Sequence, residues 1–354
     1  MTVDLGERSY PILVGSGVLS RVTETVRFAP GAVITDVNVD KLHGERLREL
    51  PFPAGHKIVL PAGEDTKSVL HWQAILEQLA LWKTGRDGGL LAFGGGVVGD
   101  VAGFAAATYM RGIPFVQLPT TLLAMVDSSV GGKTGINLAA GKNLAGAFHQ
   151  PQAVVADMDV LNSLPAREFS SGLAEVVKTA VALDAEFFSW LERHAGRIMD
   201  KEAAVLAELV VECCRLKARV VKSDEREAGL RAVLNFGHTL GHGLEKASGY
   251  ALSHGEAVAW GMRVAMAHSR HVAGLPQASI HRVERLLQAF GLATGALDGI
   301  PWGMVWEAMQ QDKKNRQGVV HMVLCEQIGR GMLPRPVTEE EMKAAMKEWT
   351  DGIR

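Results

Sequence analysis

Cysteine is scarce in this sequence: only Cys213, Cys214 and Cys325 occur among its 354 residues, and no two of them form a CxxC pair. Adjacent residues such as Cys213 and Cys214 are poorly placed for a mutual disulfide. The lack of CxxC argues against a thiol redox motif or a zinc site built on cysteine pairs. We therefore expect reduced thiols that fill the core of a cytoplasmic protein.

The sequence also lacks a strong excess of charge and an uninterrupted apolar run. Its formal net charge of −2 provides no overall basic field for nucleic acid or an anionic membrane. The apolar region 88–110 is broken by Asp100 and several glycines, and Asp4 and Glu7 stand where a signal peptide needs bases. We expect no nucleic-acid or membrane partner, and an anionic substrate would have to bind local lysines and arginines.

The first half of the chain alternates strand-like runs with helical patterns such as 68–82 and 97–110. Alternation of this kind predicts a parallel sheet with crossover helices, and hence an α/β domain over residues 1–164. The predicted strands are 10–14, 32–36, 57–60, 89–93, 115–118 and 153–156.

From about Pro165 onward, long amphipathic patterns predict a second, mostly α-helical domain over residues 165–354. A terminal helix at 338–349 is preceded by the capping-box residues Thr338 and Glu341. The other predicted elements are helices at 166–194, 201–222, 238–247, 254–272 and 278–290, and a strand at 319–324.

A glycine-rich turn at 94–99 fits the pattern G-x-G-x-x-G and lies between a predicted strand and a predicted helix. Glycines let backbone amides approach a pyrophosphate, and the start of a helix favours its negative charge. A tight turn that binds nothing is the alternative, and the motif alone leaves both open. The acid that usually follows about 20 residues later to hold the ribose is missing here.

Asp36, followed by Asn38, stands instead at the end of an upstream strand. An acid there could hold the adenosine ribose and would repel a 2′-phosphate, which favours NAD over NADP. A cap at the strand end is the alternative for Asp36. Gly63–Lys67 follows another strand, and its local pattern is more typical of a helix start with exposed charges.

Histidines are concentrated at His238, His242 and His254, with Glu256 close to the last of them. His238 and His242 are four residues apart and would share one face of a helix. This density of ligands indicates a divalent metal site, although a polar helix interface would also explain the pair alone. A zinc protease is unlikely, because Thr239 occupies the place of the glutamate in HExxH.

Glu175 is an acid within an otherwise apolar helical stretch. A buried carboxylate needs a partner, and a metal would serve, whereas a surface or salt-bridged position is the alternative. Several basic residues stand beside small or polar neighbours; singly they fit a solvated face, and together they could bind phosphate and carboxylate. They are Lys133, Lys142, Lys178, Lys217, Arg231, Lys313 and Lys314, and Asp127–Ser129 could bind substrate hydroxyls.

Taken together, these residues closely resemble the 3-dehydroquinate synthase family over essentially the whole chain. The resemblance rests on many motifs in the same order. They are Thr35–Asn38, Gly63–Lys67, Gly94–Asp100, Tyr109–Gly112, Pro119–Ala124, Asp127–Lys133, Gly141–Leu144, Leu164–Glu168, Ala174–Lys178, Leu234–His238, His254–Val258 and Asp312–Lys314.

The resemblance implies a Rossmann-like α/β nucleotide-binding domain followed by a mostly α-helical metal-binding domain. It assigns the metal, zinc or cobalt, to Glu175, His238 and His254, and places His242 beside the substrate instead. The implied NAD contacts are Asp36, Asn38, Glu64, Lys67, Gly95, Gly96, Val97, Asp100, Thr120, Thr121, Asp127, Ser128, Lys142, Val160, Leu161, Asn162 and Ser163. The implied substrate contacts are Lys133, Asn143, Lys178, Lys217, Arg231, Asn235, His242 and one or both of Lys313 and Lys314.

The implied reaction converts 3-deoxy-D-arabino-heptulosonate 7-phosphate to 3-dehydroquinate and phosphate, the second step of the shikimate pathway. NAD transiently oxidises an alcohol, phosphate leaves by β-elimination, the hydride returns, the ring opens, and an aldol closure follows. The metal acts as a Lewis acid. Arg111 is expected to reach the phosphate bound by a neighbouring subunit, which implies a homodimer.

Three other functions compete with this one. A metal-dependent polyol dehydrogenase would release NADH and would not need Lys217, Arg231, Lys313 and Lys314. A cyclase acting on a sugar phosphate without a carboxylate would not need Lys217, Arg231 and Asn235. An NAD-binding regulatory module would give no reason for Glu175, His238 and His254.

Overall fold

The chain folds into two compact units in the computed structural model, which describes residues 1–49, 56–227, 229–292, 297, 299–311 and 319–352. Unit 1 comprises Met1–Pro165 and Ala203–Lys222, and unit 2 comprises Ala166–Glu202 and Ser223–Arg354. Helix α7 (Ala203–Ser223) therefore packs almost entirely with unit 1, whereas the sequence placed it in the helical domain.

Unit 1 is built on one mainly parallel sheet in the strand order β1-β2-β9-β6-β5-β3-β4. β1 pairs antiparallel with β2, and all other neighbours in the sheet are parallel. All six predicted strands are present, which confirms the predicted α/β class. The strands are β1 (Thr2–Val3), β2 (Tyr10–Gly15), β3 (Ala29–Asp36), β4 (Lys57–Leu60), β5 (Gly88–Gly94), β6 (Phe115–Pro119) and β9 (Ala153–Asp157).

The order of the strands creates a switch point between β3 and β5. The chain leaves β3 for β4 on one side and then returns to place β5 on the other side of β3. Ligands bind α/β sheets outside the carboxyl ends of the strands at such a point. Asp36 ends β3, and the glycine turn at 94–96 ends β5.

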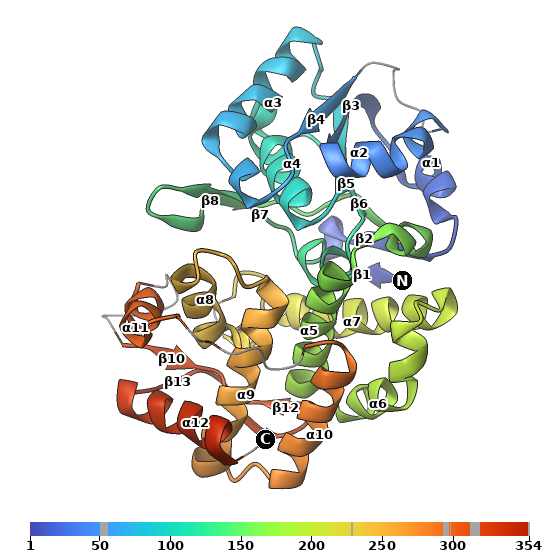
Figure 1. Ribbon diagram of the computed structural model, residues 1–354. Helices are drawn as coiled ribbons and strands as arrows, with labels where there is room; N and C mark the ends of the chain where they lie inside the picture. The colour runs from blue at the N-terminus through green and yellow to red at the C-terminus, as the bar shows by residue number, and fades with distance from the viewer. Residues whose placement is uncertain (50–55, 228, 293–296, 298, 312–318, 353–354) are drawn as a thin grey trace. The chain divides into compact units, whose positions relative to one another are not determined.

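Helices cover the sheet around an apolar core that includes Ile34, Leu90 and Val101. The two helices α3 and α4 lie side by side, and α4 packs on β5 (Figure 1). Their bounds are α3 (Val69–Leu81) and α4 (Gly96–Thr108); the shorter helices of this part are α1 (Val22–Thr25) and α2 (Val37–His43).

An antiparallel hairpin of β7 (Lys133–Leu138) and β8 (Gly141–Phe148) was not predicted. Its sequence is rich in glycine and alanine and lacks the alternation that marks a half-buried strand. Its strands pair closely because Gly135 and Gly146 face each other: a Cβ on Gly146 would lie 2.2 Å from the Thr134 carbonyl oxygen.

Unit 2 is mostly helical, as predicted, but the predicted helix 166–194 is broken at Asp184. The Asp184 side chain accepts hydrogen bonds from the amides of Glu186 and Phe187 and so begins a new helix. The helices are α5 (Ala166–Leu183), α6 (Ala185–Met199), α8 (His238–Ala247), α9 (His254–Ala273), α10 (Gln277–Ala289), α11 (Trp302–Gln310) and α12 (Glu339–Gly352).

The predicted strand 319–324 is reduced to β10 (His321–Met322), which pairs with β13 (Arg335–Pro336). β11 (Cys325–Gln327) and β12 (Arg330–Gly331) form a second short pair. The capping box before α12 is confirmed: the Thr338 amide donates to Glu341 at 2.8 Å, and the Glu341 amide donates to the Thr338 hydroxyl at 3.2 Å.

A buried ion pair joins α9 to α10. Arg263, 1% exposed, donates to Glu284 at 2.6 Å and to the Leu292 carbonyl oxygen at 2.6 Å. The guanidinium also lies near the rings of Trp260 and Trp349, and the latter belongs to α12. Each charge is therefore matched by a partner inside the helical core.

Close helix crossings at glycines hold α9 against α5 and against the turn before α8. A Cβ on Gly255 would lie 2.3 Å from the Cα of Ser171 in α5. A Cβ on Gly261 would lie 1.7 Å from the carbonyl oxygen of Gly237, the residue before α8. Only glycine lets these backbones approach so closely.

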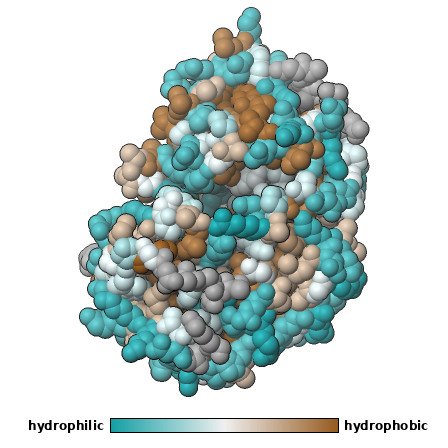
Figure 2. Space-filling view, viewed as in Figure 1, coloured by the Kyte–Doolittle hydropathy of each residue, from teal (hydrophilic) through white to brown (hydrophobic). Residues whose placement is uncertain are grey.

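The cysteines are free and buried, as expected of core filler. Among the residues described, no helix is both long and apolar enough to cross a membrane. Hydrophobic side chains gather over unit 1 on the face shown in Figure 2. Exposed apolar residues of that unit include Leu42, Leu70 and Leu81.

We predict that Gly261→Ala destabilises the protein by about 3 kcal/mol, because its methyl group has no room beside the Gly237 carbonyl. The matched control is Gly196→Ala in α6, where a Cβ would meet nothing within 4 Å. Alanine should stabilise that helix by about 0.5–1 kcal/mol. Thermal unfolding followed by circular dichroism measures both changes, and equal midpoints for the two variants would contradict the close crossing.

Candidate functional site

Three helices of unit 2 bring Glu175, His238 and His254 together. Glu175 lies in the middle of α5, whereas His238 and His254 are the first residues of α8 and α9. The Glu175 Oε1 atom is 3.5 Å from His238 Nε2 and 3.1 Å from His254 Nε2. One potential ligand atom from each residue lies within 4.8 Å of the other two.

This arrangement fits a metal ion. Ligands about 2.1 Å from a tetrahedral zinc ion are separated by roughly 3.4 Å, close to the two distances from the Glu175 oxygen. Both Nε2 atoms face Glu175, and each Nδ1 atom has an outer contact. His238 Nδ1 is 3.2 Å from the Phe236 carbonyl oxygen, and His254 Nδ1 is 3.4 Å from Glu245 Oε2.

The carboxylate at the centre of the cluster is held in its ionised form. Glu175 is only 1% exposed, and burial alone would raise its pKa. Lys178, one turn later in α5 and also 1% exposed, donates to Glu175 Oε2 at 2.6 Å. The charges of Lys178 and the two histidines outweigh burial and hold the pKa of Glu175 well below its usual range.

The carboxylates beside His254 favour its protonated form. Burial would lower the pKa of His254, but hydrogen bonds and charge from Glu175 and Glu245 outweigh it and raise the pKa to about 10. A histidine must be neutral to bind a metal, so a bound cation would take the place of this proton.

The structure corrects two expectations that came from spacing. The residues whose potential ligand atoms converge are Glu175, His238 and His254. The ring of His242 lies beside this set, with its centroid 5.3 Å from that of His238 and 6.4 Å from that of His254. Glu256 belongs to the helix start. Its carboxylate accepts from the Ser253 amide at 2.7 Å, and Arg167 donates to it at 2.6 Å.

Two further predicted residues lie on the segment just before α8. Arg231 is buried, and its guanidinium donates to the Glu225 carbonyl oxygen at 2.6 Å. The Asn235 side chain donates to Glu227 at 2.8 Å. Their places in the chain put them within a few residues of His238.

In unit 1, the turn predicted to bind a nucleotide leads directly from β5 into α4. Gly95 is the residue before the helix, and Gly96 and Val97 are its first residues. A Cβ on Gly95 would lie 3.1 Å from Thr121, and a Cβ on Gly96 would lie 3.0 Å from the Ser128 hydroxyl. The glycines therefore let the start of α4 lie close to Thr121 and Ser128 without side chains of its own.

Asp36 begins α2. Its Oδ1 atom accepts hydrogen bonds from the Asn38 amide at 2.9 Å and the Val39 amide at 3.1 Å. One oxygen of the Asp36 carboxylate therefore caps a helix, which is the alternative to ribose binding that the sequence left open. The predicted segment Val160–Ser163 lies in the short helix after β9, where the Ser163 hydroxyl is 2.8 Å from His43.

A polar cluster surrounds Lys67. Its ammonium group donates to Asp100 at 2.7 Å and to Asn143 at 2.5 Å, and lies 3.9 Å from Glu64. The pKa of Lys67 is raised, because Asp100 and Glu64 outweigh the opposing effect of burial. The structure thus brings together four residues from three separate motifs.

Lys217 of α7 forms a second pair in unit 1. Its ammonium group donates to the Asp127 carbonyl oxygen at 2.7 Å and forms an ion pair with the Asp127 carboxylate. The other predicted residues of unit 1 differ in burial. Arg111 and Lys133 are exposed, Lys142 and Thr121 are half-buried, and Thr120 is buried. Lys313 and Lys314 lie outside the described residues.

Sequence reasoning missed two polar residues. Glu245 contacts His254 and stands seven residues after His238, which puts both on one face of α8, so helical spacing would have found it. The Asn137 side chain donates to Glu64 at 2.9 Å and accepts from the Asn143 amide at 2.8 Å. No signal marks Asn137, because the hairpin itself was not recognised.

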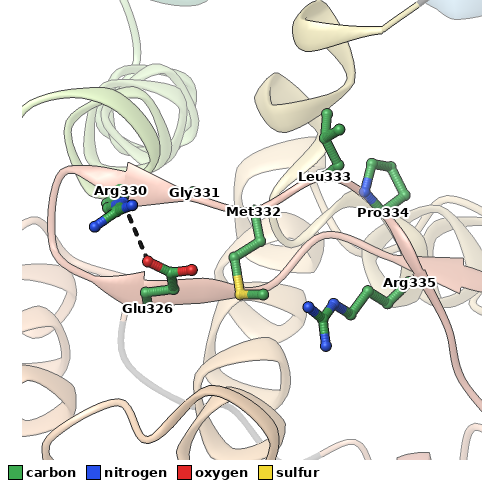
Figure 3. A pocket seen from close by; sticks show the side chains of 7 residues that line it. All are labelled: Glu326, Arg330, Gly331, Met332, Leu333, Pro334 and Arg335. Atoms are coloured by element: carbon green, nitrogen blue, oxygen red, sulfur yellow. Dashed lines mark ion pairs between the residues drawn. The ribbon is translucent and has the colours of Figure 1, made fainter.

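A hollow of about 420 Å³ on unit 2 does not involve the histidine cluster. It lies between the β11–β12 pair and β13, and the side chains of Met332 and Arg335 border it (Figure 3). Its Glu326–Arg330 ion pair, 3.1 Å long, is exposed and therefore contributes little. The groups that line it lack an arrangement suited to catalysis.

Known proteins match the chain along nearly its full length. The family model described as 3-dehydroquinate synthase N-terminal matches residues 57–171, and the one described as 3-dehydroquinate synthase C-terminal matches residues 172–315. A 3-dehydroquinate synthase of Acidithiobacillus ferrooxidans is 46% identical over 98% of this chain and 98% of its own.

Solved structures share the fold. A 2-deoxy-scyllo-inosose synthase, complexed with carbaglucose-6-phosphate, NAD⁺ and Co²⁺, has a TM-score of 0.90 at 25% identity, covering 98% of this chain and 99% of its own. The 2-epi-5-epi-valiolone synthase of Streptomyces hygroscopicus, with NAD⁺ and Zn²⁺ bound, has a TM-score of 0.87 at 29% identity, covering 98% of each chain. The sequence matches to both halves, together with this fold and the buried Glu-His-His cluster, show that the chain belongs to the 3-dehydroquinate synthase family.

Proposed function

We propose that the protein converts 3-deoxy-D-arabino-heptulosonate 7-phosphate to 3-dehydroquinate and phosphate. The observation that carries this proposal is the buried Glu175–His238–His254 cluster beside Lys178, in a chain 46% identical to a 3-dehydroquinate synthase over 98% of its length. The net reaction eliminates phosphate, so the enzyme is a lyase of the shikimate pathway, which supplies chorismate and the aromatic amino acids.

We propose that Glu175, His238 and His254 hold one zinc or cobalt ion. When bound, the ion would act as a Lewis acid on substrate oxygens. The protein prepares the site in advance: Lys178 keeps Glu175 ionised, and the outer contacts at both Nδ1 atoms turn the Nε2 atoms toward the carboxylate.

We propose that NAD binds at the carboxyl ends of β3 and β5. When bound, NAD would take a hydride from the substrate alcohol and return it after phosphate has left. The amides at Gly95–Val97 would receive the pyrophosphate, and the Asp36 carboxylate would accept from the ribose hydroxyls and repel a 2′-phosphate. The other NAD contacts are those that the family resemblance assigns.

The charges of the substrate define the role of the remaining cations. A phosphate and a carboxylate on one small molecule need several positive groups, and Arg231, Lys217, Lys133 and Lys178 supply them. Arg231 can present a planar fork to the carboxylate, an arrangement that a lysine does not provide. Asn235 and His242 would contact substrate hydroxyls. A substrate without a carboxylate would not need Lys217, Arg231 and Asn235.

We also propose that the protein is a homodimer that works in the cytoplasm. Met110, Arg111 and Gly112 form three consecutive residues at positive φ, of 49°, 68° and 124°. Non-glycine residues rarely take this conformation, which is often found where function demands it. The loop holds an exposed Arg111, as expected of a residue that reaches the phosphate of a second subunit. The reduced, buried cysteines fit a cytoplasmic location.

We predict that the protein with NAD and Zn²⁺ or Co²⁺ releases phosphate from 3-deoxy-D-arabino-heptulosonate 7-phosphate without accumulating NADH. A chelator should abolish the activity, and Glu175→Gln should lower it at least about 100-fold, because the ion loses its charged ligand. Parallel assays of phosphate and of NADH absorbance measure the two quantities. Glu202→Gln, which changes a partly exposed glutamate of unit 2, should retain full activity.

Three outcomes would contradict the proposed function. Stoichiometric NADH would favour a polyol dehydrogenase. Phosphate release only from a sugar phosphate without a carboxylate would favour a different cyclase. An unchanged rate after complete metal removal would refute the role of the Glu-His-His cluster.

The homodimer proposal predicts complementation between two inactive variants. Arg111→Ala and Glu175→Gln damage different subunits of the same site if Arg111 acts across the interface. A mixed dimer then contains one intact site out of two, so it should have about half of the wild-type rate. Co-expression with two different affinity tags supplies the mixed dimers, and each variant expressed alone is the control. Activity no greater than the sum of the two would place Arg111 in its own subunit's site.

A further inference from the structure

The outer nitrogen of His254 contacts a carboxylate side chain. Its Nε2 atom is 3.1 Å from Glu175, and its Nδ1 atom is 3.4 Å from Glu245 Oε2. The corresponding Nδ1 atom of His238 lies 3.2 Å from a backbone carbonyl oxygen, that of Phe236. Substitution can therefore remove the outer contact of His254 and leave that of His238 in place.

Glu245 reaches His254 from a neighbouring helix. It lies two turns after His238 on α8, whereas His254 begins α9, and these two helices pack closely together. Glu245 is only 8% exposed. A carboxylate so far from water needs a hydrogen-bond donor or a positive partner, and the imidazole of His254 supplies one.

We infer that Glu245 is a positioning residue that orients His254 toward the metal ion; the inference rests on the proposed metal site. By accepting the Nδ1 proton, its carboxylate fixes the tautomer in which Nε2 carries the lone pair. Outer carboxylates of this kind typically contribute 10- to 100-fold to metal affinity. Glu245 is not among the three candidate ligands, so its effect would pass through His254.

A second consequence concerns charge. The cluster contains the carboxylates of Glu175 and Glu245 and the ammonium of Lys178. A divalent ion therefore meets an immediate surrounding with a net charge of −1. Replacing Glu245 by glutamine keeps an oxygen that can accept the Nδ1 proton but removes that negative charge. Alanine removes both the acceptor and the charge, so the two variants separate orientation from charge.

The test measures metal binding by the full-length protein in the presence of NAD. Affinity for Zn²⁺ comes from competition with a chromophoric chelator, and the visible absorption of bound Co²⁺ reports the geometry of the site. We expect Glu245→Ala to weaken Zn²⁺ binding by about 10- to 100-fold and to alter the Co²⁺ spectrum. Glu245→Gln should recover the wild-type spectrum and lose less than about 10-fold in affinity.

Glu284→Gln is the matched control. Glu284 is also 8% exposed and lies in a helix of unit 2, but it pairs with Arg263 and not with a ligand of the cluster. Its substitution should lower the thermal midpoint and leave the Zn²⁺ affinity and the Co²⁺ spectrum unchanged. A purely structural role for Glu245 would instead give the same pattern for both residues.

The outcomes are distinguishable. If the wild-type protein binds neither Zn²⁺ nor Co²⁺, the proposed metal site itself fails. If it binds them and Glu245→Ala changes the affinity less than about threefold with an unaltered spectrum, the positioning role alone is wrong. If Glu245→Ala does not fold, the isosteric Glu245→Gln decides: wild-type affinity refutes a charge contribution, and a loss without a change in circular dichroism supports it.

Discussion

The helical unit is organised around a carboxylate that has almost no access to water. An ionised group in such a place is strongly unfavourable unless charges and hydrogen bonds surround it. Glu175 obtains them from Lys178 on its own helix and from His238 and His254 on two others. The close crossings at Gly255 and Gly261 are what allow α5 and the turn before α8 to meet α9 at the required distance. The buried charge thus explains both the chemistry and the packing.

In unit 1, two ion pairs likewise balance charged side chains, but their acidic partners are more exposed than Glu175. Lys67 is paired with Asp100, and Lys217 is paired with Asp127. These are residues that the family resemblance assigns to NAD or substrate, and the pairs hold them in place before any ligand arrives. Pre-organisation of this kind reduces the conformational entropy lost on binding. A ligand need only exchange contacts with side chains that are already ordered.

Much of this could be predicted from the sequence, because its local signals agree with the tertiary structure. β3 and β5 were recognised from apolar runs bounded by Asp36 and by the glycine turn. The histidine density indicated a cluster of potential metal ligands, but spacing along one helix selected His242, and proximity in sequence suggested Glu256. The third residue that the structure brings to His238 and His254 is Glu175. It comes from a helix more than 60 residues upstream of His238, and no local period can reveal that pairing. The family resemblance supplied it.

Other features required the folded chain. The β7–β8 hairpin has no alternation of polar and apolar residues, so neither the hairpin nor the role of its Asn137 was predicted. The distances at Gly237 and Gly261 arise only when two separate segments are packed. Glu245 could be predicted only in part. Its spacing of seven residues from His238 places both on one face of α8, but its contact with His254 of α9 arises only in the folded chain.

The fold and the metal cluster do not by themselves identify the substrate. Synthases that share the fold at TM-scores of 0.90 and 0.87 have bound NAD⁺ with Co²⁺ or Zn²⁺, although their products differ. Discrimination must therefore come from groups that meet the parts in which the substrates differ. A carboxylate is such a part, and a buried arginine is a costly group to keep unless an anion uses it. We propose that this distinction rests on Arg231, a buried side chain that donates to the Glu225 carbonyl oxygen and stands only a few residues before His238.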